Sequence, residues 1–329
     1  MIVAPNWLGD AVMALPAIAD VRNGTRGARL AVAARASIAP LFSLVRDVDE
    51  VITPFDKLRA SPSPLAGYDT AILLPNSFHS AMLVARAGVG ERWGYRTDWR
   101  GMLLTRAIDR APSGVHQIDS YQRLVAALGF ANGPSTPRLE IPPDVREAGS
   151  ALLRGAGWDG RTPLVAIAPG AAYGSAKRWP PSAFADLAAG LAQDGVTTVI
   201  VGASADRATA AEVTRELRGR ATVVDVVGQT DIPALAGVLV NCRALTANDS
   251  GALHLGAAAG LNVIAAFGPT DDTLTAPRSH PSPVSSHQSV VLTHETWCRP
   301  CGLRECPLDH ACMIGIPAAD VLAATRKVL

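Results

Sequence analysis

Short apolar runs rich in β-branched residues alternate with longer stretches of helical periodicity along most of the chain. In the first half, these runs predict strands at residues 1–4, 29–34, 50–53, 70–74 and 92–95. In the second half, they predict strands at residues 164–168, 197–201, 222–226, 244–247 and 263–267. Helical patterns such as 182–193 and 205–217 lie between the strands. This alternation predicts parallel sheets with helices on both faces.

The strand–helix series occurs twice, and a segment rich in Pro and Gly, residues 133–143, separates the two halves. A chain of 329 residues is also longer than one typical domain needs. We therefore expect an α/β protein with two Rossmann-like, doubly wound domains. Their expected bounds are residues 1–150 and 151–315, followed by a C-terminal helix at 316–329 that could pack back on the N-terminal domain. The helical segment near 144–155 fits either domain.

The composition suits two buried cores and excludes some classes of partner. Hydrophobic residues make up 48% of the chain, and the formal net charge is +1, so general attraction to nucleic acid is not expected. The apolar start lacks a basic leader and is interrupted by Asp10, which favours a strand, a turn and a helix over a signal peptide. We expect a cytoplasmic protein whose cysteines are reduced.

Ligands of open parallel sheets bind at the carboxyl ends of the strands, so the loops after strands are the places to search. The first strand leads into Gly9 and Asp10. Asp10 can be the N-cap of the next helix or a carboxylate that takes a proton from a hydroxyl group. No G-x-G-x-x-G fingerprint follows the strand, which disfavours a nicotinamide-dependent dehydrogenase.

The loop after the first strand of the second half, residues 169–180, combines small residues with two cations. Gly170, Gly174 and Ser175 allow a ligand to approach the backbone, and Lys177 and Arg178 add positive charge. Such a loop suits phosphate oxygens, although a solvated surface loop has the same composition.

A second turn suited to phosphate follows the strand at 244–247, where the chain reads Asn248, Asp249, Ser250 and Gly251, with His254 one turn later. The free N–H groups and the dipole of the helix that begins here can hold a diphosphate. Alternatively, Asp249 or Ser250 only caps the helix, and His254 only packs in the core.

Taken in order, these segments resemble the ADP-heptose:lipopolysaccharide heptosyltransferases of glycosyltransferase family 9, and most closely the heptosyltransferase II group. The matching segments are Gly9-Asp10, the Pro-Gly…Ala-Lys-Arg-Trp-Pro loop at 169–180, the Asn-Asp-Ser-Gly…His turn at 248–254 and Phe-Gly-Pro-Thr at 267–270. Residues 74–78 and 94–101 resemble segments of the family's acceptor domain. The cysteine-rich stretch 298–312 is similar as well.

The resemblance implies a GT-B architecture, in which two Rossmann-like domains face a central cleft. It implies an inverting transfer that needs no metal or other cofactor, with ADP-heptose as the donor held by the C-terminal domain. The implied general base is Asp10, and the implied cation on the donor phosphates is Lys177. The implied donor-binding residues are Gly170, Gly174, Ser175, Asp206, Asn248, Asp249, Ser250, Gly251 and His254.

The N-terminal domain is implied to bind the acceptor, a lipid-linked oligosaccharide of the lipid A–Kdo–heptose type, through Asn76, Ser77, Arg96 and Arg100. Two positions depart from the family pattern, because His79 replaces a lysine and Met102 replaces an acidic residue. Between residues 86 and 110 there are six arginines and three acidic residues. This stretch is either a solvated face or a basic patch for the acceptor and for the cytoplasmic face of the inner membrane.

The terminal cysteines have the spacing Cys298-x2-Cys301-x4-Cys306-x5-Cys312, which is dense enough for a structural zinc or iron–sulfur site. We nevertheless expect no metal there, because the second pair is looser than usual and the family resemblance supplies no catalytic metal. Cys242 is expected in a core.

Two alternatives to glycosyl transfer remain. A sugar-nucleotide epimerase of the same architecture would need no acceptor, and a non-catalytic nucleotide-sugar-binding protein would need neither Asp10 nor Lys177 for chemistry.

Overall fold

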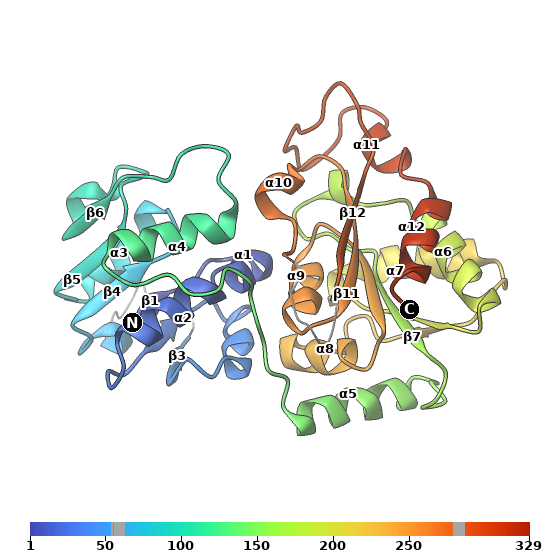
Figure 1. Cartoon of the computed structure of the whole chain (residues 1–329), viewed down its shortest axis with the longest axis horizontal. Helices are drawn as coiled ribbons and strands as arrows, with labels where there is room; N and C mark the ends of the chain where they lie inside the picture. The colour runs from blue at the N-terminus through green and yellow to red at the C-terminus, as the bar shows by residue number, and fades with distance from the viewer. Residues whose placement is uncertain (54, 56–62, 279–286) are drawn as a thin grey trace. The chain divides into compact units, whose positions relative to one another are not determined.

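The computed structural model describes residues 1–53, 55, 63–278 and 287–329, and its contacts divide them into two units, Met1–Glu140 and Ile141–Leu329 (Figure 1). Each unit has a parallel sheet of six described strands with helices packed on it. The predicted α/β fold class, two Rossmann-like parallel-sheet domains of the GT-B type, is confirmed.

The first sheet has the strand order β3-β2-β1-β4-β5-β6. Its strands are β1 (Ile2–Val3), β2 (Ala31–Ala33), β3 (Glu50–Ile52), β4 (Thr70–Leu73), β5 (Glu91–Tyr95) and β6 (Arg106–Ile108). The helices of this unit are α1 (Leu8–Met13), α2 (Leu15–Gly24), α3 (Phe78–Arg86) and α4 (Gln117–Ala127), with 3₁₀ turns η1 (Ala39–Leu44), η3 (Ser63–Leu65) and η4 (Arg100–Leu103).

The second sheet has the order β12-β11-β10-β7-β8-β9. Its strands are β7 (Leu164–Ala168), β8 (Thr197–Ile200), β9 (Val223–Asp225), β10 (Ala244–Asn248), β11 (Asn262–Phe267) and β12 (Ser289–Thr293). Its helices are α5 (Pro143–Gly155), α6 (Pro181–Gln193), α7 (Arg207–Leu217), α8 (Ile232–Leu239), α9 (Gly251–Ala258), α10 (Asp272–Thr275), α11 (Ala311–Ile314) and α12 (Ala318–Arg326), with η5 (Ser175–Lys177) and η6 (Ser204–Asp206).

Both sheets have the same topology when each unit's strands are counted from its own first strand, namely 3-2-1-4-5-6. The strand order reverses between β1 and β4 in the first unit and between β7 and β10 in the second. The crevice at such a reversal is where doubly wound sheets bind ligands. The loops after these four strands are therefore the structural candidates for a site.

The central strands are mostly apolar because helices cover both faces of the sheet. Every residue of β7 and of β10 is buried. In the same core, Trp179 meets the ring of Phe184 edge to face, with centroids 4.8 Å apart, and its indole N–H donates to the carbonyl of Ile316 at 2.9 Å. Trp179 thus packs the start of α6 against the segment before α12.

All ten predicted strands are present, and each boundary lies within two residues of the expected one. The pattern did not predict β6 and β12, which lie at sheet edges and are only half-buried.

The expected boundary at residues 150 and 151 shifts to 140 and 141, because α5 packs on α8 of the second unit. The terminal helix α12 packs on α6 and β11 of its own unit, where Val321 and Ala324 join the core.

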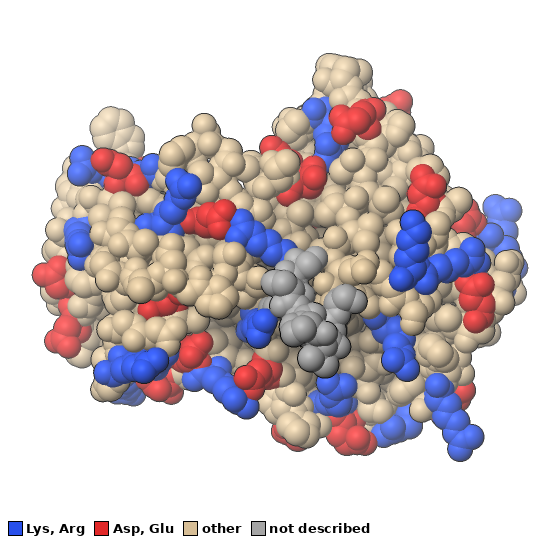
Figure 2. All heavy atoms as spheres, in the orientation of Figure 1, with Lys and Arg blue, Asp and Glu red and all other residues tan. Residues whose placement is uncertain are grey.

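None of the described helices combines the length and apolar character that a membrane span requires. Basic and acidic side chains are intermixed on the face drawn in Figure 2.

Candidate functional site

The reversal point of the second sheet brings together a buried ion pair. Lys177, at the end of the loop after β7, places its Nζ 2.5 Å from Oδ2 of Asp249, which follows β10. Their side chains are only 12% and 8% exposed. The hydroxyl of Thr270, after β11, donates to the same carboxylate oxygen at 2.7 Å, and Nε2 of His254 lies 3.8 Å from the other oxygen. Loops after three neighbouring strands thus meet at one carboxylate.

The surroundings of Asp249 keep its carboxyl group ionised. Burial alone would raise the pKa of Asp249, but the interaction with His254 and the positive charge of Lys177 lower the pKa below its ordinary value. The buried ion pair therefore joins the two loops that the sequence predicted to bind phosphate, the loop after β7 and the turn after β10.

The side chain of Asn248 holds the loops of this site together. Its side chain is fully buried, donates to the carbonyl of Pro169 at 2.8 Å and accepts from the backbone N–H of Trp179 at 2.9 Å. These bonds hold the two ends of the loop after β7 against the end of β10. Asn248 thus positions the loop after β7, residues 169–180, against the end of β10.

The N-terminus of α9 is open to a hydrogen-bond acceptor. Ser250 is its N-cap residue in extended conformation, but no side chain caps the helix. Among the described residues only three buried side-chain polar atoms have no partner, and two belong to this site: Oγ of Ser250 and Nε of Arg178. An anion bound here would satisfy the Ser250 hydroxyl, the first N–H groups of α9 and the helix dipole together. Gly251, the first residue of α9, adds no side chain that would obstruct the approach.

Close packing fixes the loops after β7 and β8 to each other. A Cβ at Gly170 would lie 2.2 Å from Cγ of Asp206, so any larger residue would displace the Asp206 side chain. The carboxylate of Asp206 also accepts from the backbone N–H of Ala203 at 2.9 Å. Asp206 is half-buried in the loop after β8. Its side chain lies next to Gly170, at the start of the loop that carries Lys177.

In the first unit, Asp10 is the third residue of α1 and is half-buried. Trp7 stands at the N-cap, without a side-chain capping bond, so the interpretation of Asp10 as the cap is wrong. A carboxylate in the first turn is still stabilised by the helix dipole. Burial, and next to it the negative charge of Asp10, raises the pKa of Tyr121 well above its ordinary value. The carboxylate of Asp10 thus lies at the end of β1, near the phenol of Tyr121 from α4.

The predicted acceptor residues have different roles. Ser77 caps α3 by accepting from the N–H of Ser80 at 3.3 Å, and Asn76 is exposed. Arg96 is largely exposed, whereas Arg100 is fully buried and donates to the carbonyls of Tyr95 and Pro75. Burial lowers the pKa of Arg100 to about 10. Arg100 therefore fixes the loops after β4 and β5 to each other, and of the two arginines only Arg96 is accessible to a ligand.

The sequence of the chain matches glycosyltransferase family 9 (heptosyltransferase) over residues 65–312, which is most of its length. The chain belongs to glycosyltransferase family 9. The resemblance drawn from the ordered motifs is confirmed, and the protein is a transferase of glycosyl groups.

Individual relatives agree with the family assignment. The chain is 27% identical to lipopolysaccharide heptosyltransferase 2 of Salmonella typhimurium, over 85% of each chain, and 27% identical to that of Escherichia coli, again over 85% of each. It is similar in structure to E. coli ADP-heptose LPS heptosyltransferase II, with a TM-score of 0.83, 26% identity, and coverage of 99% and 97% of the two chains. A family 9 glycosyltransferase from Veillonella parvula has the same fold, with a TM-score of 0.82 at 19% identity.

The cysteine-rich segment, residues 298–312, packs on the loop after β7, residues 169–180. The hydroxyl of Tyr173 donates to the carbonyl of Gly302 at 2.9 Å, and its ring has the Lys177 ammonium at 4.8 Å and the Arg304 guanidinium at 5.1 Å from its centroid. A Cβ at Gly174 would lie 2.1 Å from the carbonyl oxygen of Arg304, so this glycine permits the contact. The segment thus supports the loop that carries Lys177.

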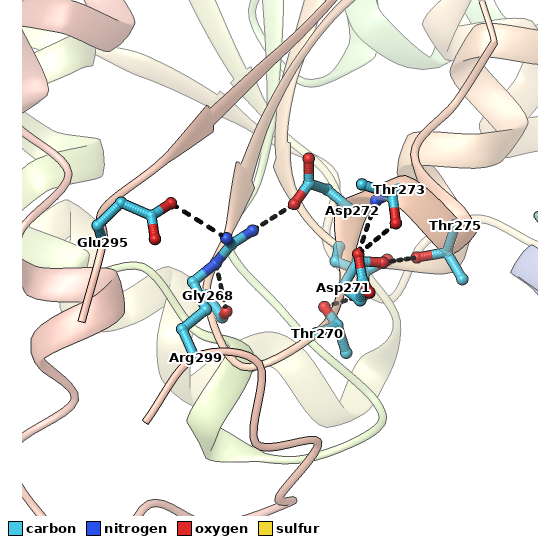
Figure 3. A network of polar contacts seen from close by, with 9 residues as sticks. Gly268, Thr270, Asp271, Asp272, Thr273, Thr275, Glu295 and Arg299 are labelled. Carbon is cyan, nitrogen blue, oxygen red and sulfur yellow. Dashed lines mark hydrogen bonds and ion pairs between the residues drawn. The ribbon is translucent and has the colours of Figure 1, made fainter. Parts of the chain in front are cut away.

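Figure 3 shows a second anchor of the same segment. The guanidinium of Arg299 donates to the carbonyl of Gly268 at 3.1 Å and pairs with Asp272, and Glu295 lies 3.4 Å away. These contacts hold the segment against the turn after β11, which also carries Thr270.

Cys298, Cys301, Cys306 and Cys312 are free and line one pocket of about 170 Å³ together with residues such as Trp297 and Leu308. In the described ranges, no group of three or more Cys, His, Asp or Glu side chains is arranged to hold a metal ion. Cys242 is partly buried as a whole residue, and burial of its thiol raises the pKa of Cys242 to about 12.

Sequence reasoning missed Thr270, Tyr173 and Arg304 as parts of this site. A hydroxyl directly after Gly-Pro at the end of a strand was the available signal for Thr270. The contact between Tyr173 and Arg304 joins residues far apart in the chain and had no local signal.

Proposed function

We propose that this family 9 enzyme transfers a heptosyl group from ADP-heptose to an acceptor of the lipopolysaccharide inner core. The relatives named above are lipopolysaccharide heptosyltransferases, which supports both the sugar and the acceptor class. The N-terminal unit binds the acceptor, and the C-terminal unit binds the donor.

The observation that carries the proposal is the combination of the Lys177–Asp249 pair with the unpartnered Ser250 hydroxyl at the open end of α9. A diphosphate has negative charge and acceptor oxygens, which the Ser250 hydroxyl and the N-terminus of α9 can bind. Its oxygens accept from Ser250 and from the first N–H groups of α9, while Lys177 neutralises the negative charge that grows as the donor bond breaks. Gly170 and Gly174 let the backbone of the loop after β7 lie close to the donor. Ser175 and Asp206 border the nucleoside of the donor.

Asp10 is the general base of the proposed reaction. It accepts the proton of the acceptor hydroxyl while that oxygen bonds to the anomeric carbon. The bond from this carbon to the diphosphate breaks at the same time, and ADP leaves with the electron pair. A single displacement from the opposite face inverts the anomeric configuration. His254 supports the step indirectly, because it holds Asp249 in the orientation that keeps Lys177 in place.

The transfer needs no metal ion in this proposal. In many nucleotide-sugar enzymes a divalent cation neutralises the diphosphate, whereas here the cationic Lys177, the Ser250 hydroxyl and the helix N-terminus provide that stabilisation. ADP-heptose is then a substrate, and no cofactor takes part.

The acceptor is a lipid-linked oligosaccharide of the lipid A–Kdo–heptose type, contacted by Arg96, Asn76 and Ser77. Arg100 keeps these residues in position. Because such an acceptor is embedded in a bilayer, the enzyme works in peripheral contact with the cytoplasmic face of the inner membrane. The arginine-rich stretch at 86–110 favours anionic lipid there.

The test is incubation with ADP-heptose, with and without the glycolipid acceptor, while ADP release and the sugar products are followed. We expect ADP release that requires the acceptor. Epimerised donor without an acceptor would support an epimerase, and donor binding without turnover would support a non-catalytic binding protein.

A further inference from the structure

The loop after β5 displays two large apolar side chains to solvent. Trp99 is 89% exposed and Met102 is 81% exposed. Phe78, at the start of α3 after β4, is 38% exposed, and its N–H donates to the carboxylate of Asp98 at 2.7 Å. Since β1, β4 and β5 are parallel neighbours, these residues lie at the same edge of the sheet as Asp10. Exposed apolar residues gathered near a functional edge indicate a binding surface.

The loop that carries Trp99 and Met102 is held firmly. The buried guanidinium of Arg100 donates to Tyr95 at 2.9 Å and to Pro75, which fixes the loop from below. Asp98 and Trp99 have φ angles of 49° and 56°, in the left-handed region that bulky residues rarely adopt. Residues held in that region by their surroundings cluster at ligand-binding sites. A tryptophan presented in this way is pre-organised for a partner.

Positive charge accompanies the apolar side chains. A Cβ at Gly101 would lie 3.2 Å from Cγ of Arg96, so the aliphatic part of the Arg96 side chain packs against Gly101, the residue before Met102. The Arg96 side chain is 63% exposed, and its Nε forms a long ion pair, 3.9 Å from Oδ1 of Asp109. Of the six arginines at residues 86–110, Arg100 is buried and Arg92 is half-buried, and the other four are exposed. An apolar tip with basic neighbours is complementary to an anionic bilayer surface.

We propose that Trp99 and Met102, flanked by Arg96, form a lipid-contact surface that enters the headgroup and acyl boundary of an anionic bilayer. This inference rests on the proposed function, because it assigns the lipid-linked acceptor's own membrane as the partner. Trp favours this boundary because its ring is apolar while its N–H stays hydrated. Arg96 then faces lipid phosphates, and the edge that bears Asp10 is held near acceptor sugars at the membrane surface.

The first experiment measures binding to vesicles of phosphatidylcholine, with and without phosphatidylglycerol, by co-sedimentation and by the shift of tryptophan fluorescence. The test variant is Trp99→Asn with Met102→Gln, because Asn tolerates the left-handed conformation. The matched control is Trp297→Asn, whose tryptophan is 88% exposed in the other unit. We expect the test variant to bind anionic vesicles roughly tenfold more weakly, and the control to bind as wild type does. Equal binding by all three proteins would overturn the proposal.

The second experiment compares kcat/KM for an acylated acceptor in anionic vesicles with that for a deacylated, soluble acceptor. The test variant should lose roughly tenfold on the vesicle-bound acceptor only. Equal loss on both acceptors would overturn the proposal in favour of a direct contact between Trp99 and acceptor sugars, and a change in oligomeric state without a change in vesicle binding would overturn it in favour of contact between copies. If wild type fails to transfer to either acceptor, the proposed function falls, while the vesicle measurement still reports on the surface.

Discussion

The two units have the same sheet topology but opposite chemistry at the point where the strand order reverses. In the first unit the helix after β1 carries the carboxylate of Asp10 in its first turn and begins without a side-chain cap. In the second unit the loops after β7 and β10 carry Lys177 and an uncapped helix with an unpartnered Ser250. In the function that we propose, the shared topology places both ligand sites at the reversal of strand order, and the residues there make one site a proton acceptor and the other an anion-binding site. The predictions below test this division of labour.

The largest expected effect is that of Asp10→Asn. The amide keeps the size of the side chain but cannot accept the proton, so turnover should fall by roughly 10²–10⁴-fold while donor affinity stays near that of wild type. Steady-state kinetics measure turnover, and calorimetric titration with ADP measures the affinity of the donor site. Turnover within about threefold of wild type would remove Asp10 from the chemistry.

Lys177→Met tests the cationic half of the comparison. It should lower kcat/KM by roughly 10²–10³-fold, because the charge that stabilises the leaving diphosphate is lost. It should also cost about 3 kcal/mol of unfolding free energy, because it leaves the buried Asp249 unpaired. The double variant Lys177→Met with Asp249→Asn is the control. It should recover stability but not activity, and recovery of both would contradict a role for Lys177 at the donor.

Ser250→Ala separates ligand binding from folding. The Ser250 hydroxyl has no partner in the protein, so its removal should leave the melting temperature unchanged. Donor affinity should fall roughly tenfold, the value of one hydrogen bond to a charged group. The matched control is Asn248→Ala, which breaks bonds to Pro169 and Trp179 and should lower stability. A drop in melting temperature for Ser250→Ala with unchanged ADP binding would show that the hydroxyl only supports the fold.

The smallest effect concerns acid stability. The pKa of Asp249 is lowered in the folded protein, so its contribution is fully present above its unfolded value of 3.8 and is lost as the pH falls through the still lower folded pKa. The difference in unfolding free energy between wild type and Asp249→Asn should therefore be larger at about pH 7 than at about pH 3. Urea unfolding at both pH values measures it. A difference that does not change with pH would mean that Asp249 is not held as a paired carboxylate.

The sequence by itself determined the repeated strand–helix pattern and the loops that carry the chemistry. Ten strands were readable because β-branched and apolar runs such as residues 164–168 are buried on both faces, a requirement written locally in the chain. Edge strand β6 has only three residues, Arg-Ala-Ile, too few to show a pattern, whereas the apolar run at residues 290–292 of β12 was a local signal that the prediction did not use. Motif order also identified the family, and the family match supports that reading.

Only the tertiary structure decided which of the polar candidates face a ligand. Arg100 and Arg96 look alike in the sequence, yet Arg100 is buried under the loop that Arg96 borders. Lys177 and Asp249 are 72 residues apart and form one ion pair, and Thr270 reaches the same carboxylate from a third strand. The physical reason is that hydrogen-bond partners and desolvation depend on which loops the sheet order brings side by side, and residue spacing along the chain does not record that order.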